Sequence, residues 1–259
     1  MNQSNLKKLQ NLLKEKDIDI FVINRSDQYL NEYISPNAER LNFITNFSGS
    51  AGRAIIMPTD AFLYVDGRYT FHANTQINAK EIQAKHLNNF WTDLEKILLE
   101  EEYKIAVDPT LHSIIEIEKV EKMLENSTSQ LQLIDKNFVD LIWENQPKTQ
   151  YTDIFDHPKS FVGQGRSEKL DILKKFLDQN EIDHYFISGL DNIAWLLNLR
   201  ADDIKYTPLL YSYLLISKNN KHSLYIKESA MPEILKKEIQ TLININNIEN
   251  IGSIFKNIN

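Results

Sequence analysis

The chain has 259 residues, of which 42% are hydrophobic, and a formal net charge of −7. That length fits one large or two ordinary domains, and the acidic charge argues against nucleic acid or an anionic membrane as the main partner, because both need a basic face. The sequence has no cysteine, which excludes disulfides, thiolate zinc sites and cysteine nucleophiles.

The first part of the chain alternates helical and strand patterns. Leu6, Leu9, Leu12 and Leu13 recur at the helical period, and a strand rich in branched apolar residues follows at 18–23. A hairpin is predicted from strands 54–57 and 62–65, which the turn-forming Pro-Thr-Asp joins. Further on we expect helices near 70–77, 92–102 and 113–124, with strands at 104–107 and 131–134. This alternation predicts an α/β fold in which helices cover both faces of a sheet.

The pattern begins again in the second part of the chain. Residues 173–191 resemble residues 9–27 at a constant offset of 164, and residues 193–199 resemble residues 41–47 at an offset of 152. A third match relates 214–227 to 54–66. Single matches arise by chance between α/β units, whereas three in the same order favour a duplication. The drop in offset places twelve extra residues, 28–39, in the first copy, and insertions of this kind often carry function.

A segment with two prolines and two glycines, residues 146–168, separates the two copies. We place the domain boundary there, with domains at 1–155 and 156–259. The second copy has no match to the strand, helix and strand that follow Glu102 in the first. We therefore expect an incomplete second domain and a chain that stops inside or just after a helix.

No targeting or membrane segment is expected. Residues 1–21 contain no apolar core of signal-peptide length, and no run approaches the roughly 18 apolar residues of a membrane span. These features favour a soluble cytoplasmic protein.

The obvious candidates for chemistry are weak. None of the six histidines has metal-site spacing, and His184, inside an apolar strand, is expected to be a hydrogen-bonded, partly buried side chain. Residues 49–52, Gly-Ser-Ala-Gly, lack the lysine of a phosphate loop and the G-x-S-x-G pattern of a nucleophile. We interpret them as a tight turn whose glycines take positive φ, with a catalytic Ser50 as the alternative. Asp202 and Asp203 are interpreted as loop charges, with metal ligands as the alternative, because adjacent carboxylates in a strand point to opposite sides.

Four charged residues between 37 and 73 remain as site candidates. Glu39 and Arg40 end the insertion, where an ordinary solvated pair is the alternative to a functional one. Asp66 follows a predicted strand and can cap the next helix. Arg68 is suited to binding a carboxylate. Its partner is either Glu39, in a structural ion pair, or a substrate or neighbouring domain, and both readings stay open.

Several segments together resemble the N-terminal region of the aminopeptidase P family, the Xaa-Pro aminopeptidases, in its long three-domain cytosolic form. The matching segments keep their order over nearly all of the chain and include EYI…ERLNFITNFSGSAGRAII, LYVDGRYTFHA, KIAVDP, IDKNFVDLIWENQP and LDNIAWLLNLRADDIKYTPLLYSYLLI. The related creatinases and prolidases are less similar in DGRY and NIAWLLNLR. Asn46 and Arg53 depart from the usual pattern, which commonly has a glycine and a small residue at these positions.

The resemblance implies an α/β fold of two related creatinase N-terminal-like domains, each a mixed β-sheet flanked by helices, with the second apparently truncated. It implies a further C-terminal pita-bread domain that holds two divalent metals, usually manganese, and hydrolyses the Xaa-Pro bond of proline-containing peptides. This chain would then hold no catalytic residue, metal or cofactor. By position, Glu39, Arg40, Asp66 and Arg68 would line the substrate cleft or a domain interface.

Partners implied by the resemblance are the pita-bread domain of the same polypeptide, the peptide substrate and, in a homodimer, a second copy. No nucleic-acid or membrane partner is expected. The alternative is a stand-alone interaction or oligomerisation module that has lost catalysis.

Overall fold

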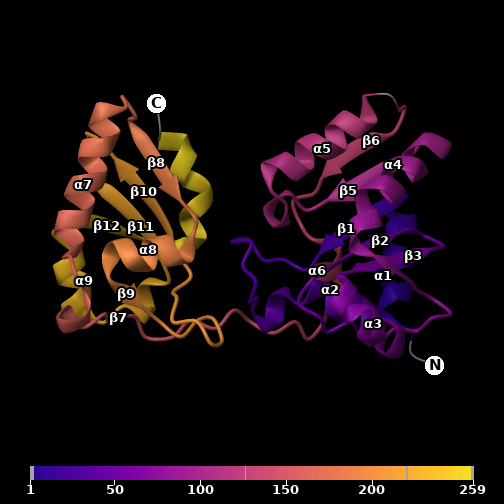
Figure 1. The fold of residues 1–259 in the computed structure, drawn as a ribbon, viewed down its shortest axis with the longest axis horizontal. Helices are drawn as coiled ribbons and strands as arrows, with labels where there is room; N and C mark the ends of the chain where they lie inside the picture. The colour runs from indigo at the N-terminus through magenta and orange to yellow at the C-terminus, as the bar shows by residue number, and fades with distance from the viewer. Residues whose placement is uncertain (1–2, 126, 220, 258–259) are drawn as a thin grey trace. The chain divides into compact units, whose positions relative to one another are not determined.

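The computed structural model describes residues 3–125, 127–219 and 221–257. They form two compact units, Met1–Lys148 and Thr149–Asn259, whose elements are labelled in Figure 1. The division lies inside the Pro- and Gly-containing segment 146–168. The boundary predicted near residue 155 falls on β7 (Phe155–Asp156), which pairs with β9 (Leu199–Arg200) of the second unit.

The first unit is built on a mixed six-stranded sheet in the order β4-β3-β2-β1-β5-β6. Its strands are β1 (Ile20–Asn24), β2 (Gly52–Ile56), β3 (Ala61–Val65), β4 (Gln83–His86), β5 (Lys104–Val107) and β6 (Gln130–Leu133). The predicted hairpin is confirmed, since β2 and β3 pair antiparallel. β1 also pairs antiparallel with β2, whereas β3–β4, β1–β5 and β5–β6 are parallel.

Helices cover both faces of this sheet, as the alternating pattern predicted. Phe21 and Ile23 of β1 share a core with α1 (Asn5–Glu15), α2 (Arg40–Thr45), α3 (Thr70–Gln76) and α6 (Phe138–Ile142). Successive residues of a strand point to opposite faces, so Ile20 and Val22 join a second core with α4 (Phe90–Glu100) and α5 (Ile114–Leu124). A capping box formed by Ser113 and Glu116 begins α5.

The second unit has a mixed four-stranded sheet in the order β12-β11-β10-β8. Its strands are β8 (His184–Ile187), β10 (Tyr213–Ser217), β11 (His222–Ile226) and β12 (Ile243–Asn247), and its helices are α7 (Arg166–Gln179), α8 (Leu190–Leu197) and α9 (Glu233–Gln240). The three helices share one apolar core with the sheet. A 3₁₀-helix, Ile248–Asn257, contributes Ile254 to a smaller cluster with Leu215 and Tyr225.

The predicted duplication is confirmed in the backbone. β8, β10, β11 and β12 pair in the same order and directions as β1, β2, β3 and β4. Asp17 and Glu181, at the offset of 164, both have left-handed backbones with φ of 54° and 55°. Asn46 and Asn198, at the offset of 152, end α2 and α8 with φ of 61° and 53°. Left-handed caps commonly end helices, and asparagine tolerates that conformation better than most residues.

The second sheet has fewer strands than the first. No element within residues 149–219 and 221–257 corresponds to β5, α5, β6 or α6. β8 consequently pairs on one side with β10, whereas its counterpart β1 pairs with both β2 and β5. The predicted end inside or just after a helix falls partly on residues 258–259, which lie outside the described residues.

Candidate functional site

The insertion in the first unit leads into α2, and its two charged candidates have different partners. Glu39 accepts a hydrogen bond from Arg25 Nη2 at 3.0 Å. Arg40 forms a bidentate ion pair with Asp140, with N–O distances of 2.7 and 2.9 Å, a geometry that is strong because both bonds are charge-assisted. Neither residue is an ordinary solvated charge, because the Arg40 and Glu39 side chains are 13% and 27% exposed.

Asp66 and Arg68 lie on the turn after β3 and contact each other. Asp66 accepts from the Arg68 backbone N–H at 3.0 Å and from Arg68 Nε at 2.8 Å. These bonds lower the pKa of Asp66. Asp66 thus caps the 3₁₀ turn Gly67–Tyr69 that precedes α3, whereas α3 itself, whose N-cap is Tyr69, has no side-chain cap among the described residues. Of the two partners left open for Arg68, Glu39 is not the one in this structure, because Glu39 pairs with Arg25 and Arg68 pairs with Asp66. The Arg68 side chain is 73% exposed, so its guanidinium faces solvent over most of its surface.

Arg25 was missed by sequence reasoning, although it organises this part of the first unit. It follows β1 and donates to the carbonyls of Glu32 at 2.9 Å and Ser50 at 3.2 Å, besides its bond to Glu39. One guanidinium thereby holds the insertion, the start of α2 and the Gly-Ser-Ala-Gly loop together. A signal existed, because the offset of 164 aligns Arg25 with Gly189, a change from a small residue to a cation beside the insertion.

The Gly-Ser-Ala-Gly loop needs its glycines for space. The expectation of positive φ is wrong, because no glycine in the described part of the chain has positive φ. A Cβ on Gly49 would lie 2.2 Å from Phe47 Cζ, and one on Gly52 would lie 3.0 Å from Phe47 Cε1. Ser50 Oγ lies 2.7 Å from the Tyr69 hydroxyl, and this hydrogen bond lowers the pKa of Tyr69. Ser50 is thus paired with a phenol and not with a histidine base, unlike the serine of a catalytic triad.

A polar pocket of about 390 Å³ lies at the C-terminal end of β1. It lies where the C-terminal ends of the parallel strands β1 and β5 meet the N-terminal end of the antiparallel strand β2. Arg53 contacts Glu116 in an ion pair and lies over the rings of Phe90 and Trp91 at 5.3 and 5.4 Å. The pocket lining includes Arg25, Arg53, Ser113 and Glu116, none of which is among the four candidates.

Asp203 is more than a loop charge. Its carboxylate accepts from the Thr152 N–H at 2.7 Å, the Thr152 hydroxyl at 3.0 Å and the Tyr211 N–H at 2.9 Å. Burial raises its pKa despite these bonds. Both aspartates lie outside helices and strands, as the loop interpretation predicted, and Asp202 is exposed. Asp203 differs because its carboxylate is bound by two segments that are distant in the sequence. His184 was predicted correctly, since its Nδ1 lies 3.1 Å from Ser217 Oγ in a half-buried position.

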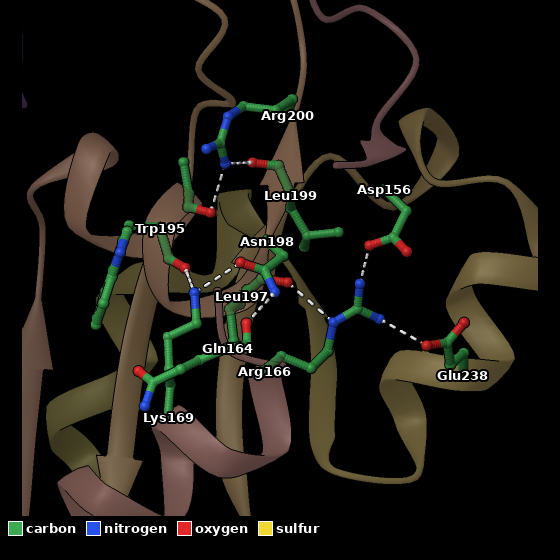
Figure 2. Close-up of polar contacts among 11 residues, drawn as sticks. Asp156, Gln164, Arg166, Lys169, Trp195, Leu197, Asn198, Leu199, Arg200 and Glu238 are labelled. Atoms are coloured by element: carbon green, nitrogen blue, oxygen red, sulfur yellow. Dashed lines mark hydrogen bonds and ion pairs between the residues drawn. The ribbon is translucent and has the colours of Figure 1, made fainter. Parts of the chain in front are cut away.

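Basic side chains converge on the C-terminal end of α8 in the second unit, as Figure 2 shows. Lys169 Nζ donates to the Trp195 carbonyl and, at 2.6 Å, to Asn198 Oδ1. Arg200 donates to the Ala194 carbonyl at 2.6 Å. The last carbonyls of a helix lack intrahelical donors and carry the negative end of its dipole, so these cations complete the helix end.

Arg166 joins this helix end to a pair of carboxylates. Its Nε donates to the Leu197 carbonyl at 3.0 Å, while its other nitrogens contact Asp156 and, at 2.9 Å, Glu238 (Figure 2). Arg166 lies in helical register with Leu170, and a charge at such a core-facing position is the sequence signal that was overlooked. The pocket beside it measures about 400 Å³.

Lys169 is buried and has no carboxylate partner among the described residues. Burial, with Arg200 and Arg166 nearby, lowers its pKa. A lysine in this setting stabilises a helix end, and we find no nucleophile–base pair beside it.

Two negative findings concern the described residues as a whole. No group of three or more His, Cys, Asp or Glu side chains among them is placed to hold a metal ion. None of their helices is both long enough and apolar enough to cross a membrane.

Both units match known protein domains. Residues 5–136 and residues 145–259 each match the creatinase/prolidase N-terminal domain. The chain is 32% identical over 244 residues to a probable Xaa-Pro aminopeptidase P of Paracoccidioides brasiliensis (strain Pb03), covering 93% of this chain and 39% of that protein. It is 34% identical over 235 residues to one of Neosartorya fischeri, covering 89% and 36%.

The structural comparison agrees with the sequence matches. The crystal structure of an X-prolyl aminopeptidase from Caenorhabditis elegans, a cytosolic enzyme with a di-nuclear active site, is similar with a TM-score of 0.90 at 25% identity. The likeness covers 98% of this chain and 43% of that one. The chain therefore spans less than half the length of the relatives it matches.

Proposed function

The chain belongs to the creatinase/prolidase N-terminal domain family, and on that premise we propose that it is the N-terminal, non-catalytic portion of a metal-dependent Xaa-Pro aminopeptidase. One observation carries the proposal: both units together resemble the worm aminopeptidase, over nearly all of this chain and less than half of that enzyme. The full polypeptide would be a hydrolase that releases the first residue of peptides with proline second.

In this proposal the two divalent metals, which we expect to be manganese, are held by a C-terminal pita-bread domain and not by this chain. A bond to proline is a tertiary amide without an N–H, and paired metals polarise its carbonyl and supply hydroxide without needing that donor. The residues of this chain would bind and orient the peptide and contact the catalytic domain.

Among the four predicted residues, Arg68 is the best candidate for direct contact with a partner. Its side chain is largely exposed and its Asp66 partner lies in the same turn, so the guanidinium is available to a carboxylate of the peptide or of a facing domain. Glu39 and Arg40 have internal partners. We propose that they position the insertion at the rim of the cleft.

We further propose that the protein acts in the cytoplasm, which the cytosolic location of the worm relative supports. The proposal also includes a second copy of the chain as a partner, in a homodimer. The alternative function, a stand-alone interaction or oligomerisation module, is favoured if the natural coding sequence ends at Asn259.

The test compares the 259-residue chain with the polypeptide extended by its natural downstream sequence, both supplied with Mn²⁺. We expect the extended protein to cleave an Xaa-Pro peptide and the shorter chain to be inactive. Cleavage by the purified shorter chain, with manganese bound stoichiometrically, would refute the proposed division of labour.

A further inference from the structure

A short helix covers an apolar face of the first unit. The ring of Phe138, at the start of α6, lies 5.1 Å from that of Phe21 in β1. Trp143, just after α6, stacks on Phe43 of α2 with ring centroids 4.3 Å apart. Phe21 is fully buried as a result. Two ion pairs hold the helix in place: Arg40–Asp140 at 2.7 Å and Lys8–Glu144 at 3.6 Å.

The equivalent face of the second unit is uncovered. The offsets of 164 and 152 align Phe21 with Tyr185 and Phe43 with Trp195. Trp195 is 60% exposed and Tyr185 47%, and the neighbouring Ile172 and Phe176 of α7 are 52% and 53% exposed. These four side chains line one groove of about 380 Å³ together with Leu173 and Leu196. We call this groove the uncovered face.

The contacts in the first unit indicate what belongs on this face. We propose that the uncovered face binds a short helix equivalent to α6, supplied by the segment that follows residue 259 in the longer polypeptide; this inference rests on the proposed function. The helix presents an aromatic ring to Tyr185 and a second one to Trp195, as Phe138 and Trp143 do for Phe21 and Phe43. Exposed aromatic clusters of this kind typically mark an interaction site.

The chemistry of the occupant differs from that of α6 in two places. Lys8, which pairs with Glu144, is replaced by Ile172 in the second unit, and Arg40, which pairs with Asp140, is replaced by Asn192. A carboxylate at the Asp140 position, which is 31% exposed in the first unit, would lose its cation where little water can replace it, and this is unfavourable. At the Glu144 position, which is 81% exposed, the loss is that of a weak surface ion pair. Lys169 also lines the groove, but its ammonium is already bound by the Trp195 carbonyl and Asn198 Oδ1. The structure therefore assigns the face to a helix that is neutral at the position of Asp140 and needs no charge at the position of Glu144.

The experiment appends a second copy of residues 134–146 to the chain through a flexible Gly/Ser linker, which raises its effective concentration to about millimolar. One version is unchanged, and one carries Asp140→Asn and Glu144→Leu in the appended copy. The matched control carries Phe138→Ser and Trp143→Ser there. Hydroxyl-radical footprinting reads the exposure of Trp195, Tyr185 and Phe176 individually, and Phe71, 76% exposed in the first unit, is the internal reference.

We expect the neutralised version to lower the oxidation rates of the three side chains several-fold, the unchanged version to lower them less, and the control and Phe71 to show no change. In the protein extended by its natural downstream sequence, the same side chains should be protected to a similar extent. Two results would overturn the inference: unprotected side chains with the neutralised version, or protection by the serine control.

A second copy of the chain is the competing occupant. Protection of Trp195 that increases with concentration in the chain without an appended helix would also overturn the inference. The outcomes separate the two proposals. Suppose that the natural gene stops at Asn259 and that the neutralised version still protects the three side chains. The chemistry inferred for the face would then be supported, but the proposed function and the assigned source of the helix would be refuted. An active extended protein with an unprotected face would refute only the docking inference.

Discussion

Replacing Asn198 by glycine should destabilise the second unit, while the same change at Asn46 should leave the first unit unaffected. Both residues end a helix with a left-handed backbone, so glycine fits both positions equally well. The relief of left-handed strain, about 1 kcal/mol, is offset by the greater freedom of glycine in the unfolded chain, about 0.4–1 kcal/mol. Backbone effects therefore nearly cancel at each site.

The side chains differ between the two positions. Asn198 Oδ1 accepts from the buried Lys169 ammonium at 2.6 Å and Asn198 Nδ2 donates to the Gln164 carbonyl at 3.1 Å (Figure 2). A hydrogen bond to a charged group contributes about 1.5–3 kcal/mol and a neutral one about 0.5–1.5 kcal/mol. We expect Asn198→Gly to lower the free energy of unfolding by about 2–4 kcal/mol. The exposed side chain of Asn46 makes no comparable bond among the described residues, and its change should stay within about 1 kcal/mol.

Native-state hydrogen exchange measured by mass spectrometry checks this prediction in the intact chain, since it reads the opening free energies of α2 and α8 separately. The amides of α8 should lose protection in Asn198→Gly, and those of α2 should keep it in Asn46→Gly. Equal changes in the two variants would show that the contacts of Asn198 contribute nothing, and the account of the α8 end would be wrong.

Three further predictions concern charged groups. Because burial lowers the pKa of Lys169 below its ordinary value of 10.5, the folded state binds fewer protons than the unfolded chain at pH values between the two. The cost of keeping the buried ammonium protonated is present at neutral pH and is relieved as the pH rises. Urea titrations should therefore show wild type gaining stability relative to Lys169→Met between pH 7 and 10. A falling difference would contradict this. Asp203→Ala should cost the second unit about 2–4 kcal/mol through three lost hydrogen bonds. Asp203→Asn, which keeps one acceptor oxygen for Thr152, should cost less in the same titration; equal costs would argue against the assigned bonds. Arg68→Ala should leave the melting temperature nearly unchanged, because it removes one exposed ion pair, and should lower Xaa-Pro cleavage by the extended protein. A collapse of its melting temperature would make Arg68 structural.

The α/β class, the hairpin of β2 and β3, the strand β5 and the duplication of the two units were all predictable from the amino-acid sequence alone. These features depend on local periodicity and on the order of segments along the chain, which are readable without knowing the packing. The repeat also extends to backbone conformation, since Asn46 and Asn198, which the sequence aligns, are both left-handed. The partly buried, hydrogen-bonded state of His184 followed from its place in an apolar strand.

Which charged side chains form ion pairs depends on tertiary packing. Glu39 pairs with Arg25 and not with Arg68, and Arg40 pairs with Asp140, a hundred positions away along the chain. Asp203 is a partly buried acceptor because the fold brings Thr152 onto it. An ion pair or hydrogen bond forms between side chains that packing brings within about 3 Å, and local sequence patterns contain no record of that distance.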